Sequence, residues 1–80
     1  MNTANDNKQK SIWIYTTNID TSDMIHQVEP IINAQPEVMT WSVDTEDVDN
    51  VLRVEVKNLA ENHLETLLSA HGFYCCAIED

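Results

Sequence analysis

The sequence contains one glycine, two cysteines and no long apolar segment, and each scarcity excludes a class of protein. The single glycine, Gly72, is too few for a glycine-rich loop that would cradle a phosphate group. No apolar run approaches the ~20 residues that a membrane-spanning helix needs, and residues 1–10 lack the apolar core of a signal peptide. Cys75 and Cys76 are adjacent, so they cannot form an ordinary disulfide and are expected to be reduced thiols. We therefore expect a cytoplasmic protein.

Basic residues are scarce as well. The chain has 4 Lys and Arg residues against 14 Asp and Glu residues, which gives a formal net charge of −10. Affinity for nucleic acids and for anionic lipid surfaces comes from Lys and Arg, so neither is an expected partner. The surplus of acid keeps a small protein soluble, and a basic protein partner or a cation stays open as an alternative.

Catalytic signatures are missing from the sequence. It has no Ser-His-Asp order with supporting motifs, and His63 is expected on the polar side of a helix. An acid–base pair with shifted pKa values needs a cleft, which a two-layer domain of this size rarely encloses. We expect no enzymatic activity and no cofactor.

Apolar spacing predicts six elements of secondary structure after a polar tail. Residues 1–10 are expected to be flexible. Strand patterns cover residues 11–17, 38–44, 51–56 and 73–78. Helical spacing begins at Thr21, capped by Asp20 or Thr21, and again at Leu59, with Gly72 as the second stop.

The order of these elements, β-α-β-β-α-β, predicts one α+β domain over residues 11–80. It matches the ferredoxin-like arrangement, a two-layer fold with a four-stranded antiparallel sheet and both helices on one face. In that topology three connections meet at one end of the molecule, namely residues 18–24, 44–50 and 71–74.

The same order and spacing resemble the heavy-metal-associated domain family of copper and zinc chaperones. That family runs strand, M-x-C-x-x-C, helix, P-G-V, hairpin, helix, G-F or G-Y, strand. Here Ile19 stands at the buried methionine, and Thr21 and Met24 stand at the two cysteines. "PEV" at 36–38 replaces P-G-V, and "GF" at 72–73 matches. The resemblance implies a degenerate member that has lost the metal motif.

Loss of the two cysteines changes the expected chemistry. Cu(I) and Zn(II) sites of this type depend on thiolates, whereas Thr21 offers a hydroxyl and Met24 a neutral thioether. We expect no metal at Thr21 and Met24. The alternative is a soft-metal carrier with a relocated site built from Met24, His71 and Cys75 or Cys76. A competing interpretation places Met24 and one cysteine in the core.

An acidic turn follows the second strand and contains Asp44, Glu46, Asp47 and Asp49. Its negative charge could attract a hard cation such as Ca²⁺. It lacks, however, the glycine of a calcium-binding loop and the fixed spacing of that loop's ligands. A solvated turn and a docking patch for a basic partner are the other interpretations.

Aromatic residues on the strands supply the interface hypothesis. If Ile12 and Ile14 face the helices, then Trp13 and Tyr15 lie on the open face of the sheet, and Trp41 can join them. Exposed aromatic patches usually mark interfaces. The sequence thus predicts a non-enzymatic binding module that acts through protein contacts, with a protein partner or a second copy of itself.

Overall fold

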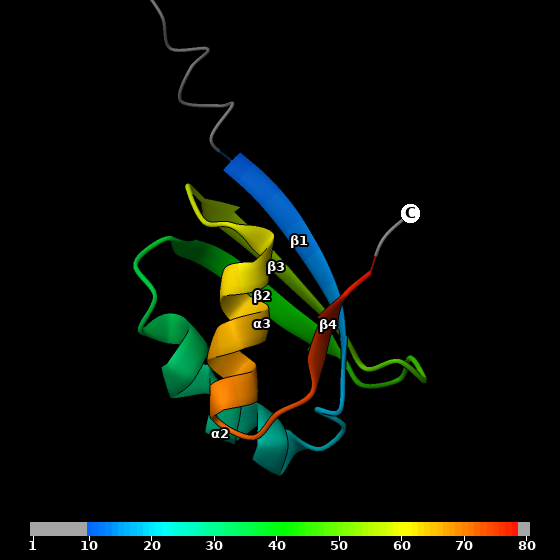
Figure 1. Ribbon diagram of the computed structural model, residues 1–80. Helices are drawn as coiled ribbons and strands as arrows, with labels where there is room; N and C mark the ends of the chain where they lie inside the picture. The colour runs from blue at the N-terminus through cyan, green and yellow to red at the C-terminus, as the bar shows by residue number, and fades with distance from the viewer. Residues whose placement is uncertain (1–9, 79–80) are drawn as a thin grey trace, which may run out of the picture.

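Figure 1 shows the computed structural model of the protein, which describes residues 10–78. The elements are β1 (Lys10–Thr17), α2 (Ser22–Asn33), β2 (Val38–Asp44), β3 (Val51–Lys57), α3 (Glu61–Ala70) and β4 (Cys75–Ala77). The four strands form one sheet in the order β2-β3-β1-β4, and every neighbouring pair is antiparallel. The predicted α+β, ferredoxin-like arrangement is confirmed.

Element ends differ slightly from the sequence prediction. Lys10 already belongs to β1, while the flexible tail predicted for the residues before it lies outside the described residues. The last strand is shorter than residues 73–78, because only Cys75–Ala77 pair as a strand. Within residues 10–78, neither helix is long and apolar enough to cross a membrane.

Helix α2 begins where the sequence places its cap. Thr21 has an extended backbone (φ −132°), and its hydroxyl accepts a hydrogen bond from the Met24 backbone N–H at 3.2 Å. This contact satisfies one of the free donors in the first turn, and Asp23 lies near the positive end of the helix dipole. Pro30 lies within the helix, which continues to Asn33.

The core lies between the helices and one face of the sheet. Its fully buried side chains come from strands β1 and β3, from both helices and from the loop before α2. They are Tyr15, Ile19, Val28, Ile32, Leu52, Val54, Val56, Leu64 and Leu68. Of the apolar residues in the two helical patterns, Ile25 and Leu67 are only partly buried and pack against the edge of this core.

The side chains of β1 point in the directions opposite to those that the interface hypothesis assumed. Tyr15 is fully buried and Trp13 packs against the core, whereas Ile12 and Ile14 are 47% and 37% exposed. The Trp13 indole N–H donates to the Leu59 carbonyl at 2.8 Å, which places the ring on the helix side. Tyrosine and tryptophan rings bury a large apolar area, and their O–H or N–H group can still donate a hydrogen bond inside the protein. Both properties favour placing these residues on the core face of the sheet. The placement of Trp13 and Tyr15 on the open face is therefore wrong.

Trp41 is also directed toward the helices. Its indole N–H donates to Oδ1 of Asn33 at the end of α2, at 2.8 Å. Its Cα pairs with that of Val54, a core residue that pairs with Trp13 on the other side. The three side chains share one face of the sheet, because directly paired residues do so. The open face thus lacks all three predicted aromatic residues.

Candidate functional site

Three connections converge at one end of the molecule, as the topology predicted. The Thr17 backbone N–H donates to the Asp49 carbonyl at 3.0 Å, and the Thr17 hydroxyl donates to the Asn50 carbonyl at 2.6 Å. The Tyr74 backbone N–H donates to Oδ1 of Asn18 at 3.0 Å. The end of β1 is therefore tied to the β2–β3 turn, and the loop after β1 to the segment before β4.

The loop between β1 and α2 is held to the core by Ile19. Ile19 is fully buried, and its backbone N–H donates to the Thr17 hydroxyl at 3.1 Å. At the start of α2, the Thr21 hydroxyl caps the helix and Met24 is partly buried against the core. The two side chains thus have structural roles in capping and packing.

The two cysteines lie on opposite faces of β4, as strand alternation predicts. Cys75 is buried opposite Thr17, and Cys76 is exposed opposite Thr16. Burial raises the pKa of the Cys75 thiol to about 12, and the negative charge of Glu65 and the neighbouring Cys76 add to this rise. A thiol with so high a pKa stays protonated at neutral pH, and a protonated thiol is a poor metal ligand.

Among the residues of the relocated metal site, His71 has a partner within its own helix. His71 ends α3, and its Nδ1 lies 3.0 Å from the Leu67 carbonyl of the same helix. Among residues 10–78, no three His, Cys, Asp or Glu side chains gather where they could hold a metal ion. The relocated site built from Met24, His71 and one cysteine stays a prediction.

The acidic turn uses its carboxylates to shape its own backbone. Oδ1 of Asp44 accepts from the Glu46 N–H at 3.1 Å, and Oδ1 of Asp47 accepts from the Asp49 N–H at 2.9 Å. Asn50 completes the turn at φ 47°, a left-handed conformation that asparagine tolerates. Asp44 and Asp47 therefore stabilise the conformation of the turn.

A contact that the sequence analysis missed protects the outer edge of the sheet. Oε2 of Glu65 on α3 accepts the backbone N–H of Ala77 on β4 at 2.6 Å. Free donors along an edge strand invite pairing with another chain, and this carboxylate occupies one of them. No signal in the sequence separates Glu65 from the other helical acids.

The open face of the sheet exposes isoleucines instead of aromatic residues. Ile12 and Ile14 lie on β1, and Ile78 follows β4, with its backbone N–H donating to the Ile14 carbonyl at 2.8 Å. Ile78 is 40% exposed. Three β-branched apolar side chains therefore lie on or beside β1 at the open face. The signal in the sequence was the apolar character of both alternating sets in "SIWIYTT".

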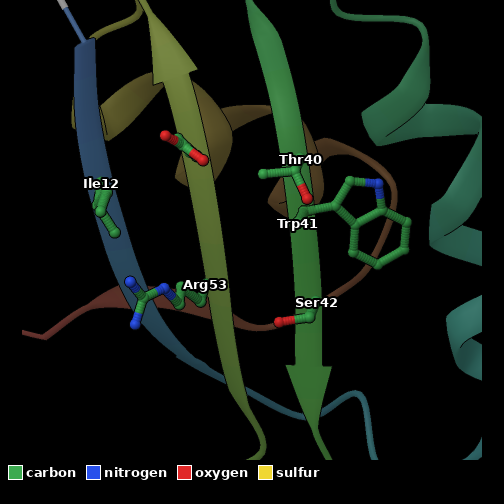
Figure 2. Close-up of a pocket in the computed structure, with 6 residues that line it drawn as sticks. Ile12, Thr40, Trp41, Ser42 and Arg53 are labelled. Carbon is green, nitrogen blue, oxygen red and sulfur yellow. The ribbon is translucent and has the colours of Figure 1, made fainter.

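Strand pairing arranges the centre of this face as two rows across β2, β3 and β1. The first row is Thr40, Glu55 and Ile12, and the second row is Ser42, Arg53 and Ile14. Figure 2 shows these strands side by side, with the Arg53 guanidinium directed toward β1. Five of the residues in these rows, all except Ile14, line a shallow hollow of about 80 Å³ together with Trp41, which lies between Thr40 and Ser42 in the chain. We call these six residues in two rows the sheet-face array.

Positive charge is concentrated on the same face. The three Lys and Arg residues in the described part of the chain, Lys10, Arg53 and Lys57, all alternate with core residues on β1 or β3. Nζ of Lys10 lies 3.1 Å from Oε2 of Glu55. Within residues 10–78, that is the one ion pair, so Arg53 has no carboxylate partner there. The other surfaces hold most of the acids.

Comparison with protein families, curated proteins and solved structures finds no match to this chain. The open sheet face and the loop between β1 and α2 are therefore the features that indicate a function.

Proposed function

We propose that this protein is a small, non-enzymatic binding module that acts through protein contacts at the open face of its sheet. The observation that supports the proposal most directly is the exposure of Ile12, Ile14 and Ile78 on one uncovered face. Apolar side chains gathered on an exposed surface mark an interaction site more often than scattered ones do. The sheet-face array adds one acid and one base, which give such a contact orientation.

The proposal includes descent from a metal-binding architecture. The buried Ile19, the capped start of α2 and the three converging connections are the features that a heavy-metal-associated domain uses to present its loop. With Thr21 and Met24 in place of thiolates, the loop has kept this local structure without the metal ligands. The free thiols of Cys75 and Cys76 support a place in the reducing cytoplasm.

Photo-cross-linking in cells that make the protein tests this function. A photoreactive phenylalanine analogue at position 14 lies on the open face, and the same analogue at Gln27 lies on the exposed side of α2. We expect position 14 to give discrete protein adducts that mass spectrometry identifies, and position 27 to give none of them. If position 14 gives no protein adduct, the proposed function is wrong.

A further inference from the structure

We infer that the partner of the open sheet face is a second copy of the same chain, packed face to face around a two-fold axis. This inference rests on the proposed function, because it names the partner of the same surface. It is supported by the order of side chains in the sheet-face array, by the distribution of charge and by the size of the face.

The sheet-face array is complementary to itself. Consider a two-fold axis that lies between two facing sheets and runs across the strands, between the two rows. It lays each strand over its own copy in the opposite direction, so the first row meets the second row of the other copy. The facing pairs are Thr40 with Ser42, Glu55 with Arg53, and Ile12 with Ile14. Each pair joins side chains of matching chemistry, and each occurs twice, as an isologous contact requires.

Sheet twist disturbs the Glu55–Arg53 pairing little, because both residues lie on a central strand. Glu55 and Arg53 lie on β3, which has β2 on one side and β1 on the other. Packed sheets align within about 30° and lie ~10 Å apart, so displacement is smallest near the centre. Long acidic and basic side chains reach across that gap. Arg53, which has no carboxylate partner within residues 10–78, gains one in the dimer.

Charge distribution favours this face over any other for self-contact. Two chains of net charge −10 repel each other at long range. The described basic residues Lys10, Arg53 and Lys57 all lie on the open face, where the acids are Glu55 and Asp44, whereas the rest of the acidic turn and the helical acids lie elsewhere. Packing the two open faces together directs the acidic surfaces outward, where water and salt screen them.

The size of the face is consistent with a reversible dimer. Strands β1, β2 and β3 have 8, 7 and 7 residues and β4 has 3, which at ~3.3 Å per residue and ~4.8 Å between strands gives a face of roughly 400 Å². Two such faces bury roughly 800 Å² of projected area, which is below the ~1,000 Å² of a stable interface and suits a weak, transient one. We therefore expect association that depends on protein concentration rather than a permanent dimer.

Charge reversal with mixing tests the arrangement directly. In the Arg53→Glu variant, residues 53 and 55 on β3 are both acidic. In the Glu55→Arg variant, both are basic. Each variant alone sets like charges opposite each other, so its self-association should weaken by roughly tenfold or more. Mixed in equal amounts, the two variants place acid opposite base at both positions, so a heterodimer should form. Sedimentation velocity over a concentration series measures all three samples.

Matched controls separate the contact from general charge and apolar effects. Glu29→Arg makes the same charge change on the exposed side of α2 and should leave the wild-type dimer intact. Ile14→Ser should weaken the dimer, whereas Val48→Ser at the acidic turn should not, although Val48 is the more exposed residue. Circular dichroism establishes that each variant is folded.

The outcomes distinguish this inference from the proposed function. A wild-type chain that stays monomeric near millimolar concentration overturns the dimer, and so does a mixture of the two folded charge variants that fails to associate. If position 14 then cross-links to a different protein, the binding function stands and only the identity of its partner changes. If cross-linked peptides join position 14 to the Ile12 region of another copy, the dimer is supported in the cell.

Discussion

The hydroxyl of Tyr15 on β1 donates a 2.7 Å hydrogen bond to the backbone carbonyl of Glu61, the first residue of α3. This bond joins a central strand to the start of a helix 46 residues later in the chain. It places the Tyr15 ring within the core and thereby assigns Ile12 and Ile14 to the opposite, open face. The position of the candidate interface thus depends on how a buried phenol finds its acceptor.

Removal of that hydroxyl should destabilise the domain modestly. We expect Tyr15→Phe to lower the free energy of unfolding by about 0.5–1.5 kcal/mol, since the ring still packs and only one hydrogen bond is lost. Urea denaturation measures the change. Tyr74→Phe is the matched control, because Tyr74 is 55% exposed and its loss of a hydroxyl should have almost no effect. Equal losses in the two variants would contradict the placement of Tyr15.

Two leucines on α3 should respond differently to truncation. Leu64 is fully buried, whereas Leu67 is partly buried at the edge of the core. We expect Leu64→Ala to cost ~2–5 kcal/mol, because it leaves a cavity that the surroundings fill only in part. Leu67→Ala should cost about 1 kcal/mol, near the average for single substitutions. Thermal and urea unfolding of both variants test the orientation of α3, and a larger loss at Leu67 would show that the helix is rotated.

Alkaline pH should destabilise the protein through two buried acids. Burial raises the pKa of Cys75 from 9.0 to about 12 and also raises the pKa of Tyr15 above its ordinary value of 10.0. Each group therefore keeps its proton to a higher pH in the folded state than in the unfolded state. Their contribution to stability is complete below pH 9 and is lost as the pH rises from 9 through the folded-state values.

Removing the Cys75 thiol tests this linkage. Cys75→Ala should flatten the decline of the unfolding free energy above pH 9, and Tyr15→Phe should flatten the decline above pH 10. The measurement is urea unfolding at intervals from pH 7 to pH 11. An unchanged slope in Cys75→Ala would mean that the thiol is not buried as described.

Two cysteines introduced into the loop before α2 should create a copper site. The wild-type protein is expected to bind Cu(I) weakly, because Thr21 and Met24 supply no anionic sulfur. The double change Thr21→Cys and Met24→Cys should bind one Cu(I) in competition with a colorimetric chelator. Because Thr21 caps α2, the metal-free variant should lose about 0.5–2 kcal/mol of stability, which bound copper should offset.

The single change Thr21→Ser serves as the control for this experiment, since serine keeps the cap and adds no thiol. Tight stoichiometric Cu(I) binding by the wild-type protein would refute the prediction that Thr21 and Met24 hold no metal. Failure of the folded double variant to bind would weaken the resemblance to heavy-metal-associated domains.

The sequence by itself determined the order of elements and several local details. Helical and alternating apolar spacing located both helices and all four strands, because one buried face imposes its period on each element. The cap of the first helix was predicted to be Asp20 or Thr21, because a capping side chain acts within four residues, and the structure shows that it is Thr21. The alternation of Cys75 and Cys76 followed from strand geometry alone.

Only the tertiary structure decided which face of β1 is buried. In "SIWIYTT" both alternating sets are apolar, so the period of two does not say which set lies inside. Trp13 and Tyr15 face the helices because each buries a large ring and also donates a hydrogen bond to a backbone carbonyl near the start of α3. Isoleucine has no donor for those carbonyls. Long-range partners of this kind are invisible to local spacing, and they placed Ile12 and Ile14 on the surface that we propose binds a second copy.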